Sequence, residues 1–239
     1  MSEETREETI EENNVLKIKS IRTSSNAFNM KLKEGDIILA LDGELINKSY
    51  EDLSKELQEI KDQKILTLFR NGVFFNTFVY GSLGVVCENQ SFAEIPELEN
   101  FNSKHEVDLD AFYQQFEVFK KIGNPAILLN TYPSILASLA PPFWMIENRL
   151  WNFLGISLIF YMVLIMISPW LFFIGWILKS WYVGNSQIEI LRLFYRLNNY
   201  SQSLSFCAKN EKEAQELSRK FDSKIDFYYS YLEPVVIED

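Results

Sequence analysis

The chain has 239 residues, with 23 basic and 33 acidic side chains and a formal net charge of −10. This acidity excludes nucleic-acid binding and argues against docking on anionic lipid through a basic patch. Two distant cysteines and a single histidine exclude a disulfide framework and a multi-histidine metal site, so we expect no cofactor and no metal.

The N-terminal 14 residues are rich in glutamate and lack the basic and apolar regions of a signal peptide. We therefore expect residues 1–14 to form a disordered acidic tail that begins on the cytoplasmic side. Apolar and polar residues then alternate from Val15 to Ile21, and GDIILALDG (35–43) is a short apolar run between two glycine-bearing turns. Both patterns predict strands.

Two local signals follow. Ser49 and Asp52 form a capping-box pattern at the start of a helix, on which Leu53 and Leu57 have the spacing of a buried face. Asn71-Gly72 predicts a tight hairpin turn between two strands. Residues 15–87 are therefore predicted to form a small, β-rich domain with one well-marked helix.

Residues 88–107 are polar and acidic, and we expect a linker there. In the segment 108–123, Phe112, Phe116 and Phe119 have helical spacing, which predicts an amphipathic helix that packs on a neighbouring domain or lies in a membrane interface. Residues 124–149 are apolar but interrupted by prolines. We expect amphipathic and interfacial helices over 108–149 as a whole.

A charge-free apolar stretch between Arg149 and Lys179 is the clearest feature of the chain. As a helix it would be about 43 Å long, which exceeds the roughly 30 Å hydrocarbon core of a bilayer. A hairpin turning at Ser168-Pro169, one long tilted span, and an interfacial arrangement all remain open. We favour a transmembrane hairpin over 150–184, because proline breaks helices and basic residues flank both ends.

Several side chains are expected to anchor this segment in the membrane. Indole rings and a snorkelling lysine suit the boundary between lipid and water. The candidate anchor residues are Trp144, Trp151, Pro169, Trp170, Trp176, Lys179 and Trp181. We expect residues 185–239 to form cytoplasmic helices followed by a tail.

The order of signals from 15 to 80 resembles a bacterial PDZ domain of the HtrA-associated type. The matching pieces are VLKIKSI, SSNAF, LKEGDIILALDGELI, SYEDLSKELQEI and ILTLFRNG. The resemblance implies peptide binding by strand addition beside the helix. The carboxylate-binding loop of the family is missing before Val15.

A permuted arrangement would let GSLGVV (81–86) supply the missing loop, with Leu83, Gly84 and Val85 resembling its hydrophobic-Gly-hydrophobic core. The alternative is an ordinary closing strand. Tyr50 and Ser54 on the helix are the candidate residues lining a groove.

The second half also shows a resemblance. SLAPPFWMIENRLW, the apolar run and VGNSQIEILRLFYRLNNY look like a family of bacterial membrane domains of unknown function. This resemblance covers about residues 133–215 and implies a hydrophobic pair of helices, but no activity.

Nothing in the sequence predicts an enzyme. No nucleophile elbow is present, Ser168 lacks a histidine or lysine partner, and Asp36 and Asp42 suit turn positions. We expect an α+β chain in which a PDZ-like domain precedes an α-helical membrane domain, located at a bacterial inner membrane. The expected partners are the lipid bilayer and a protein or peptide tail.

We predict a membrane-anchored protein-interaction module. The alternatives are a structural membrane component whose PDZ-like domain is self-occluded, and an accessory subunit of a membrane protease or transporter.

Overall fold

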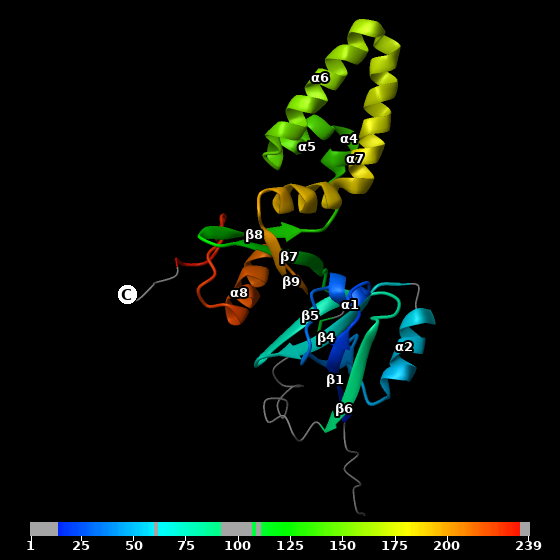
Figure 1. Ribbon diagram of the computed structural model, residues 1–239, viewed down its shortest axis with the longest axis vertical. Coiled ribbons are helices and arrows are strands. Elements are labelled where there is room, and N and C mark those ends of the chain that lie inside the picture. The colour runs from blue at the N-terminus through cyan, green and yellow to red at the C-terminus, as the bar shows by residue number, and fades with distance from the viewer. Residues whose placement is uncertain (1–13, 60–61, 92–106, 109–110, 235–239) are drawn as a thin grey trace, which may run out of the picture. The chain divides into compact units, whose positions relative to one another are not determined.

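The computed structural model describes residues 14–59, 62–91, 107–108 and 111–234. Most of the expected acidic tail and linker, residues 1–13 and 92–106, lies outside this described part. The fold is α+β, with helices and a nine-stranded sheet (Figure 1).

The chain divides into two compact units, which we describe separately. The sheet unit comprises residues 1–118, 125–128 and 202–239, and the helical unit comprises 119–124 and 129–201, so that β7 and β8 contribute to both. The first half of the chain contains β1 (Asn14–Ile21), α1 (Asn26–Asn29), β2 (Ile37–Leu41), β3 (Glu44–Leu45), α2 (Tyr50–Glu59), β4 (Lys64–Arg70), β5 (Val73–Val79) and β6 (Val85–Ser91). The second half contains β7 (Gln114–Lys121), β8 (Asn124–Asn130), α4 (Ile135–Leu139), α5 (Pro141–Glu147), α6 (Trp151–Ile167), α7 (Pro169–Leu197), β9 (Ser201–Ala208) and α8 (Glu211–Phe221).

The strands follow the order β6-β1-β2-β4-β5-β9-β7-β8, and β3 pairs with β2. β4 and β5 form the predicted hairpin: Arg70 pairs with Val73, while Asn71 and Gly72 have φ values of 51° and 80°. Two consecutive positive φ angles define the turn that Asn-Gly favours. The predicted cap of α2 is also present, because Ser49 Oγ accepts the Asp52 N–H at 3.3 Å.

Alternate residues of the sheet unit enter two apolar clusters, as expected of strands that are covered on both faces. Ile38 belongs to the larger cluster, which also contains Leu53 and Leu57 of α2 and Ala214 of α8. Ile37 and Leu39 enter a smaller cluster together with Phe69. The helices α2 and α8 therefore pack into the same core.

The predicted amphipathic helix over 108–123 is wrong, because residues 114–121 form strand β7. Phe116 and Val118 are fully buried in the core of the sheet unit, whereas Phe119 contacts the Tyr195 ring at 5.2 Å within the helical unit. This alternation has the period of a strand, and pairing within the sheet overrides the helical spacing of the phenylalanines. Residues 124–130 are likewise strand β8, and β9 interrupts the helices expected over 185–239.

In the helical unit, α6 ends at Ile167 and α7 begins at Pro169. Ser168 between them is extended, with φ −165° and ψ 135°, as expected of a residue that precedes proline. The two helices approach closely at Gly175, where a Cβ would lie 2.2 Å from Leu164 Cδ1. Gly184 lets α7 approach α4, because a Cβ there would lie 3.0 Å from Ser138 Cα.

The expected transmembrane hairpin, and with it an integral membrane location, is contradicted. In the described part of the chain, no helix combines the length and apolar character needed to cross a bilayer. The 17 residues of α6 rise about 26 Å, less than the roughly 30 Å hydrocarbon core. The charge of Lys179 interrupts the apolar part of α7 after its first ten residues.

Candidate functional site

Strand β6 lies at one end of the sheet order and pairs with β1 in antiparallel register, with Cys87 opposite Ile18 and Glu88 opposite Lys17. Among the strands that the structure describes, β1 is the only neighbour of β6. The side chains of β6 from Val86 to Asn89 are exposed or half-buried. An edge strand of this kind presents backbone groups to which a further strand can pair.

The loop before β6 is held by α1 and the residue that precedes it. Leu83 is fully buried and its carbonyl accepts the Ala27 N–H at 3.0 Å. The Asn26 side-chain amide donates to the carbonyl of Ser82 at 3.0 Å. Gly84 has a φ of 70°, and a Cβ at this position would lie 2.6 Å from Ser25 Cβ. Both the backbone conformation and the close approach therefore require glycine there.

Helix α2 contacts the same loop. Tyr50 Oη accepts the backbone N–H of Val85 at 3.3 Å, and the hydroxyls of Ser54 and Ser82 are 3.3 Å apart. The structure thus brings together all five residues that the sequence suggested for peptide binding. It also shows that the Val85 amide already has an acceptor within the chain, which the sequence did not suggest.

The two aspartates of the GDIILALDG run have separate structural roles. The Asp36 carboxylate is buried, pairs with the Arg70 guanidinium through two 2.6 Å contacts and accepts the Lys33 N–H at 2.7 Å. Asp42 accepts the Ile65 N–H at 2.8 Å and pairs with Lys64, whose pKa it raises through this side-chain hydrogen bond. They are not a catalytic pair.

Arg70 is a buried charged residue that the sequence did not single out. Its guanidinium carbon lies 5.1 Å from the Phe75 ring centroid and 5.8 Å from that of Phe221, so it links Asp36 to α8. The only feature of the sequence that marks Arg70 is its position at the end of a predicted strand, directly before the Asn71-Gly72 turn.

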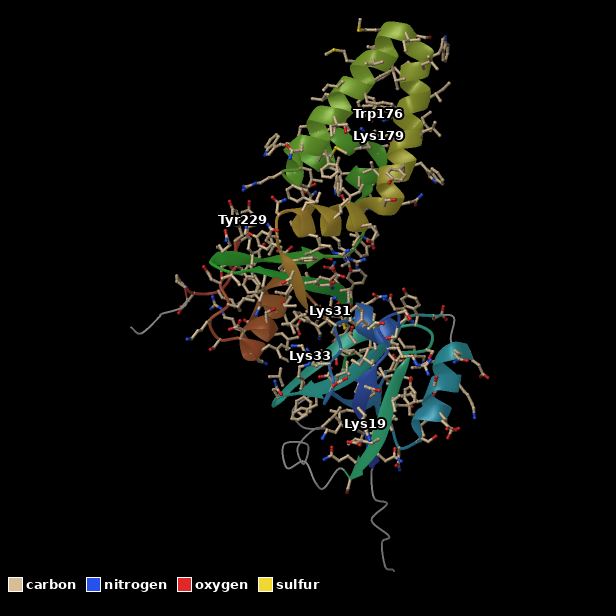
Figure 2. All side chains as sticks on the ribbon, viewed as in Figure 1. Lys19, Lys31, Lys33, Trp176, Lys179 and Tyr229 are labelled. Carbon is tan, nitrogen blue, oxygen red and sulfur yellow. The ribbon has the colours of Figure 1, made fainter. Side chains whose placement is uncertain are left out.

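The expected anchor residues occupy different environments in the helical unit. Trp144 is 2% exposed and belongs to the buried face of α5, so it is a core residue and not an anchor. Pro169 and the indoles of Trp151, Trp170 and Trp181 are exposed. Trp176 and Lys179 lie between α6 and α7, where the Trp176 ring stacks on Tyr161 at 5.2 Å (Figure 2).

Lys179 has an apolar environment. Its ammonium nitrogen lies 4.9 Å from the ring centroid of Tyr161 and 5.5 Å from that of Phe160. Desolvation by these neighbours lowers the pKa of Lys179. Ile156, Phe160, Gly175, Leu178, Lys179 and Tyr182 line a groove of about 430 Å³ on this face of the hairpin.

The two thiols, Cys87 and Cys207, are free. Burial raises the pKa of Cys87 to about 12, and it also raises the pKa of Cys207. Neither thiol is therefore an activated nucleophile. Among the described residues, no group of three or more His, Cys, Asp or Glu side chains is arranged to hold a metal ion.

No protein-family model matches the chain, and no curated protein matches it significantly.

Proposed function

We propose that the protein is a protein-interaction module that receives an extended peptide at the open edge of β6, beside α2. The observation that carries this proposal is the open edge itself, preceded by a glycine loop held against Tyr50 and Ser54. A peptide added there would pair its backbone with β6 and place alternate side chains toward the helix.

A second candidate is a structural role in which the same site is closed by the chain itself. It is favoured by the hydrogen bond between the Val85 N–H and Tyr50 Oη, since that amide lies in the loop that a peptide carboxylate would approach. The two candidates differ in whether the wild-type protein binds any extended peptide.

The test is a binding screen of the full chain against a peptide library, with free and amidated C-termini, followed by fluorescence anisotropy on the hits. Tyr50→Phe removes the acceptor of the Val85 N–H, so we expect tighter binding of peptides with a free carboxylate. Tyr80→Phe is the matched control, because the Tyr80 ring is 67% exposed. Binding by Tyr50→Phe alone would support the self-occluded candidate, and binding by neither protein would refute peptide recognition at this loop.

Strand addition is tested with two proline variants, Cys87→Pro and Glu88→Pro. Consecutive residues of an antiparallel strand direct their N–H groups to opposite edges, so one variant breaks the pairing with β1 and the other removes an N–H from the open edge. We expect the variant that keeps its circular dichroism spectrum to lose peptide binding. If that variant binds like the wild type, the peptide does not pair with β6.

A further inference from the structure

The outer part of the helical hairpin, residues 160–178, is uncharged and strongly apolar at its surface. We call it the hairpin tip. Its exposed large apolar side chains are those of Phe160, Met162, Val163, Ile165, Met166, Ile167, Trp170, Leu171, Phe173, Ile174, Ile177 and Leu178. Isolated exposed apolar residues are ordinary, but a contiguous group of this extent marks a surface that another apolar phase covers.

The exposed residues do not form a single stripe. Ile165, Met166 and Ile167 follow one another on α6, and all are at least half exposed. Each step along a helix turns by about 100°, so these three side chains cover most of the outward circumference of α6. A protein groove receives one face of a helix, at positions such as i, i+4 and i+7. Fluid acyl chains surround a helix, and this pattern fits them better.

The tip has the depth of one leaflet. From Pro169 to Lys179, helix α7 rises about 15 Å, half of the roughly 30 Å hydrocarbon core. Lys179 contacts Phe160 on the other arm, so the first charge of α7 lies at the level of Phe160. Helix α6 stays apolar on the N-terminal side of Phe160, where Ile156, Leu158 and Ile159 are exposed, so the polar boundary is set by α7. Trp181 and Tyr182 follow at once and are exposed, and such rings favour the headgroup region.

Lys179 gives that level a positive charge, which is complementary to an anionic surface. Among the described residues, no acidic side chain forms an ion pair with Lys179, whose ammonium lies over the rings of Phe160 and Tyr161. The helical unit has six basic and two acidic side chains, a net charge of +4, although the whole chain carries −10. The acidity that argued against anionic lipid therefore belongs to the rest of the chain.

We propose that the hairpin tip docks into one leaflet of an anionic phospholipid bilayer, with Lys179 at the level of the phosphates and neither helix crossing the bilayer. The groove that Lys179 lines has mostly apolar walls, which suits an acyl chain whose anionic headgroup contacts the ammonium. This inference is independent of peptide binding at β6.

The test is co-flotation of the full chain with vesicles of phosphatidylcholine alone and with vesicles that also contain phosphatidylglycerol. Met166 is 80% exposed at the tip, and we expect Met166→Asp to weaken vesicle binding about a hundredfold, because the carboxylate must enter the acyl region. Ile122→Asp is the matched control: Ile122 is fully exposed in the same unit but outside the hairpin, so this variant should bind like the wild type.

Lys179→Gln tests the contribution of the charge to vesicle binding separately from that of the apolar tip. We expect it to reduce the preference for phosphatidylglycerol about fivefold, with little effect on binding to phosphatidylcholine. Lys19→Gln, an exposed lysine of the sheet unit, should leave the preference unchanged.

Two results would overturn the proposal. One is absence of flotation with both vesicle types while circular dichroism shows a folded protein. The other is sedimentation as a dimer that Met166→Asp converts to a monomer, without any vesicle binding, because the apolar tip would then be covered by a second copy of the chain.

Discussion

Asp36→Ala tests whether the buried ion pair holds the sheet unit together. The Asp36 carboxylate is 1% exposed and the Arg70 side chain 7%, and two 2.6 Å contacts join them. The substitution leaves the guanidinium buried, with the Lys31 carbonyl at 3.0 Å as its remaining hydrogen-bond partner. The Lys33 N–H loses its acceptor at the same time.

The expected loss of stability is large, because an uncompensated charge remains in the core. Removing one partner of a buried ion pair costs about 3–5 kcal/mol. Each factor of ten in an equilibrium constant corresponds to about 1.4 kcal/mol, so the opening equilibrium of the sheet unit should rise about 10²- to 10⁴-fold. An exposed pair gives the contrast: Glu216→Ala removes the partner of Lys212 on α8 and should cost no more than about 0.5 kcal/mol.

Hydrogen exchange read by mass spectrometry suits this measurement. All five tryptophans lie in the helical unit, so their fluorescence does not report on the sheet unit. Peptides covering β2 and β4 should lose protection in Asp36→Ala and keep it in Glu216→Ala, while peptides from α6 serve as an internal reference. If the protection factors of the β4 peptides fall by less than about tenfold in Asp36→Ala, the ion pair does not stabilise this core and the reasoning is refuted.

Three further predictions concern glycine packing, thiol reactivity and the desolvated lysine. Gly184→Ala should destabilise the helical unit by about 1–3 kcal/mol, because the added Cβ meets the α4 backbone; urea unfolding followed by tryptophan fluorescence measures this. Gly155→Ala should stabilise the unit slightly, because no atom lies within 4 Å of the added Cβ. Equal effects of the two substitutions would contradict this packing. Iodoacetamide should modify Cys87 and Cys207 slowly at pH 8 and rapidly in denaturant, since burial raises both pKa values; fast native labelling would contradict their burial. Lys179→Met should remove part of the pH dependence of the free energy of unfolding. Because the pKa of Lys179 is lowered in the folded protein, the unfolded chain binds more protons, and the stability of the wild type should rise relative to that of the variant as the pH rises toward 10. Absence of this trend in urea unfolding would contradict the desolvation of Lys179.

Local chemistry made part of the candidate site predictable. The φ of 80° at Gly72 and the Ser49 cap depend on residues next to them, and the sequence indicated both. The hydrogen bond between Tyr50 and Val85 joins residues 35 positions apart. Nothing near either residue predicts it, because it forms only when α2 packs beside the loop.

Strands β7 and β9 show the same limit in the fold. The spacing of Phe112, Phe116 and Phe119 satisfies a helix, and only the pairing of residues 114–121 within the sheet selects the strand. The contact of β9 with β5 joins Cys207 to Asn76, positions far apart in the chain. Pairing over such distances leaves little mark in any short window of sequence.

The sequence by itself determined the helix break at Ser168-Pro169 and the charge-free run around it, because proline geometry and side-chain polarity are local properties. Only the tertiary structure decided how long each arm is, that Lys179 faces Phe160 and Tyr161, and that Trp144 is buried. It also showed that the acidic residues lie almost entirely outside the helical unit, which carries a net charge of +4 while the whole chain carries −10. These properties depend on which distant segments pack together, and the composition of the whole chain carries no information about that packing.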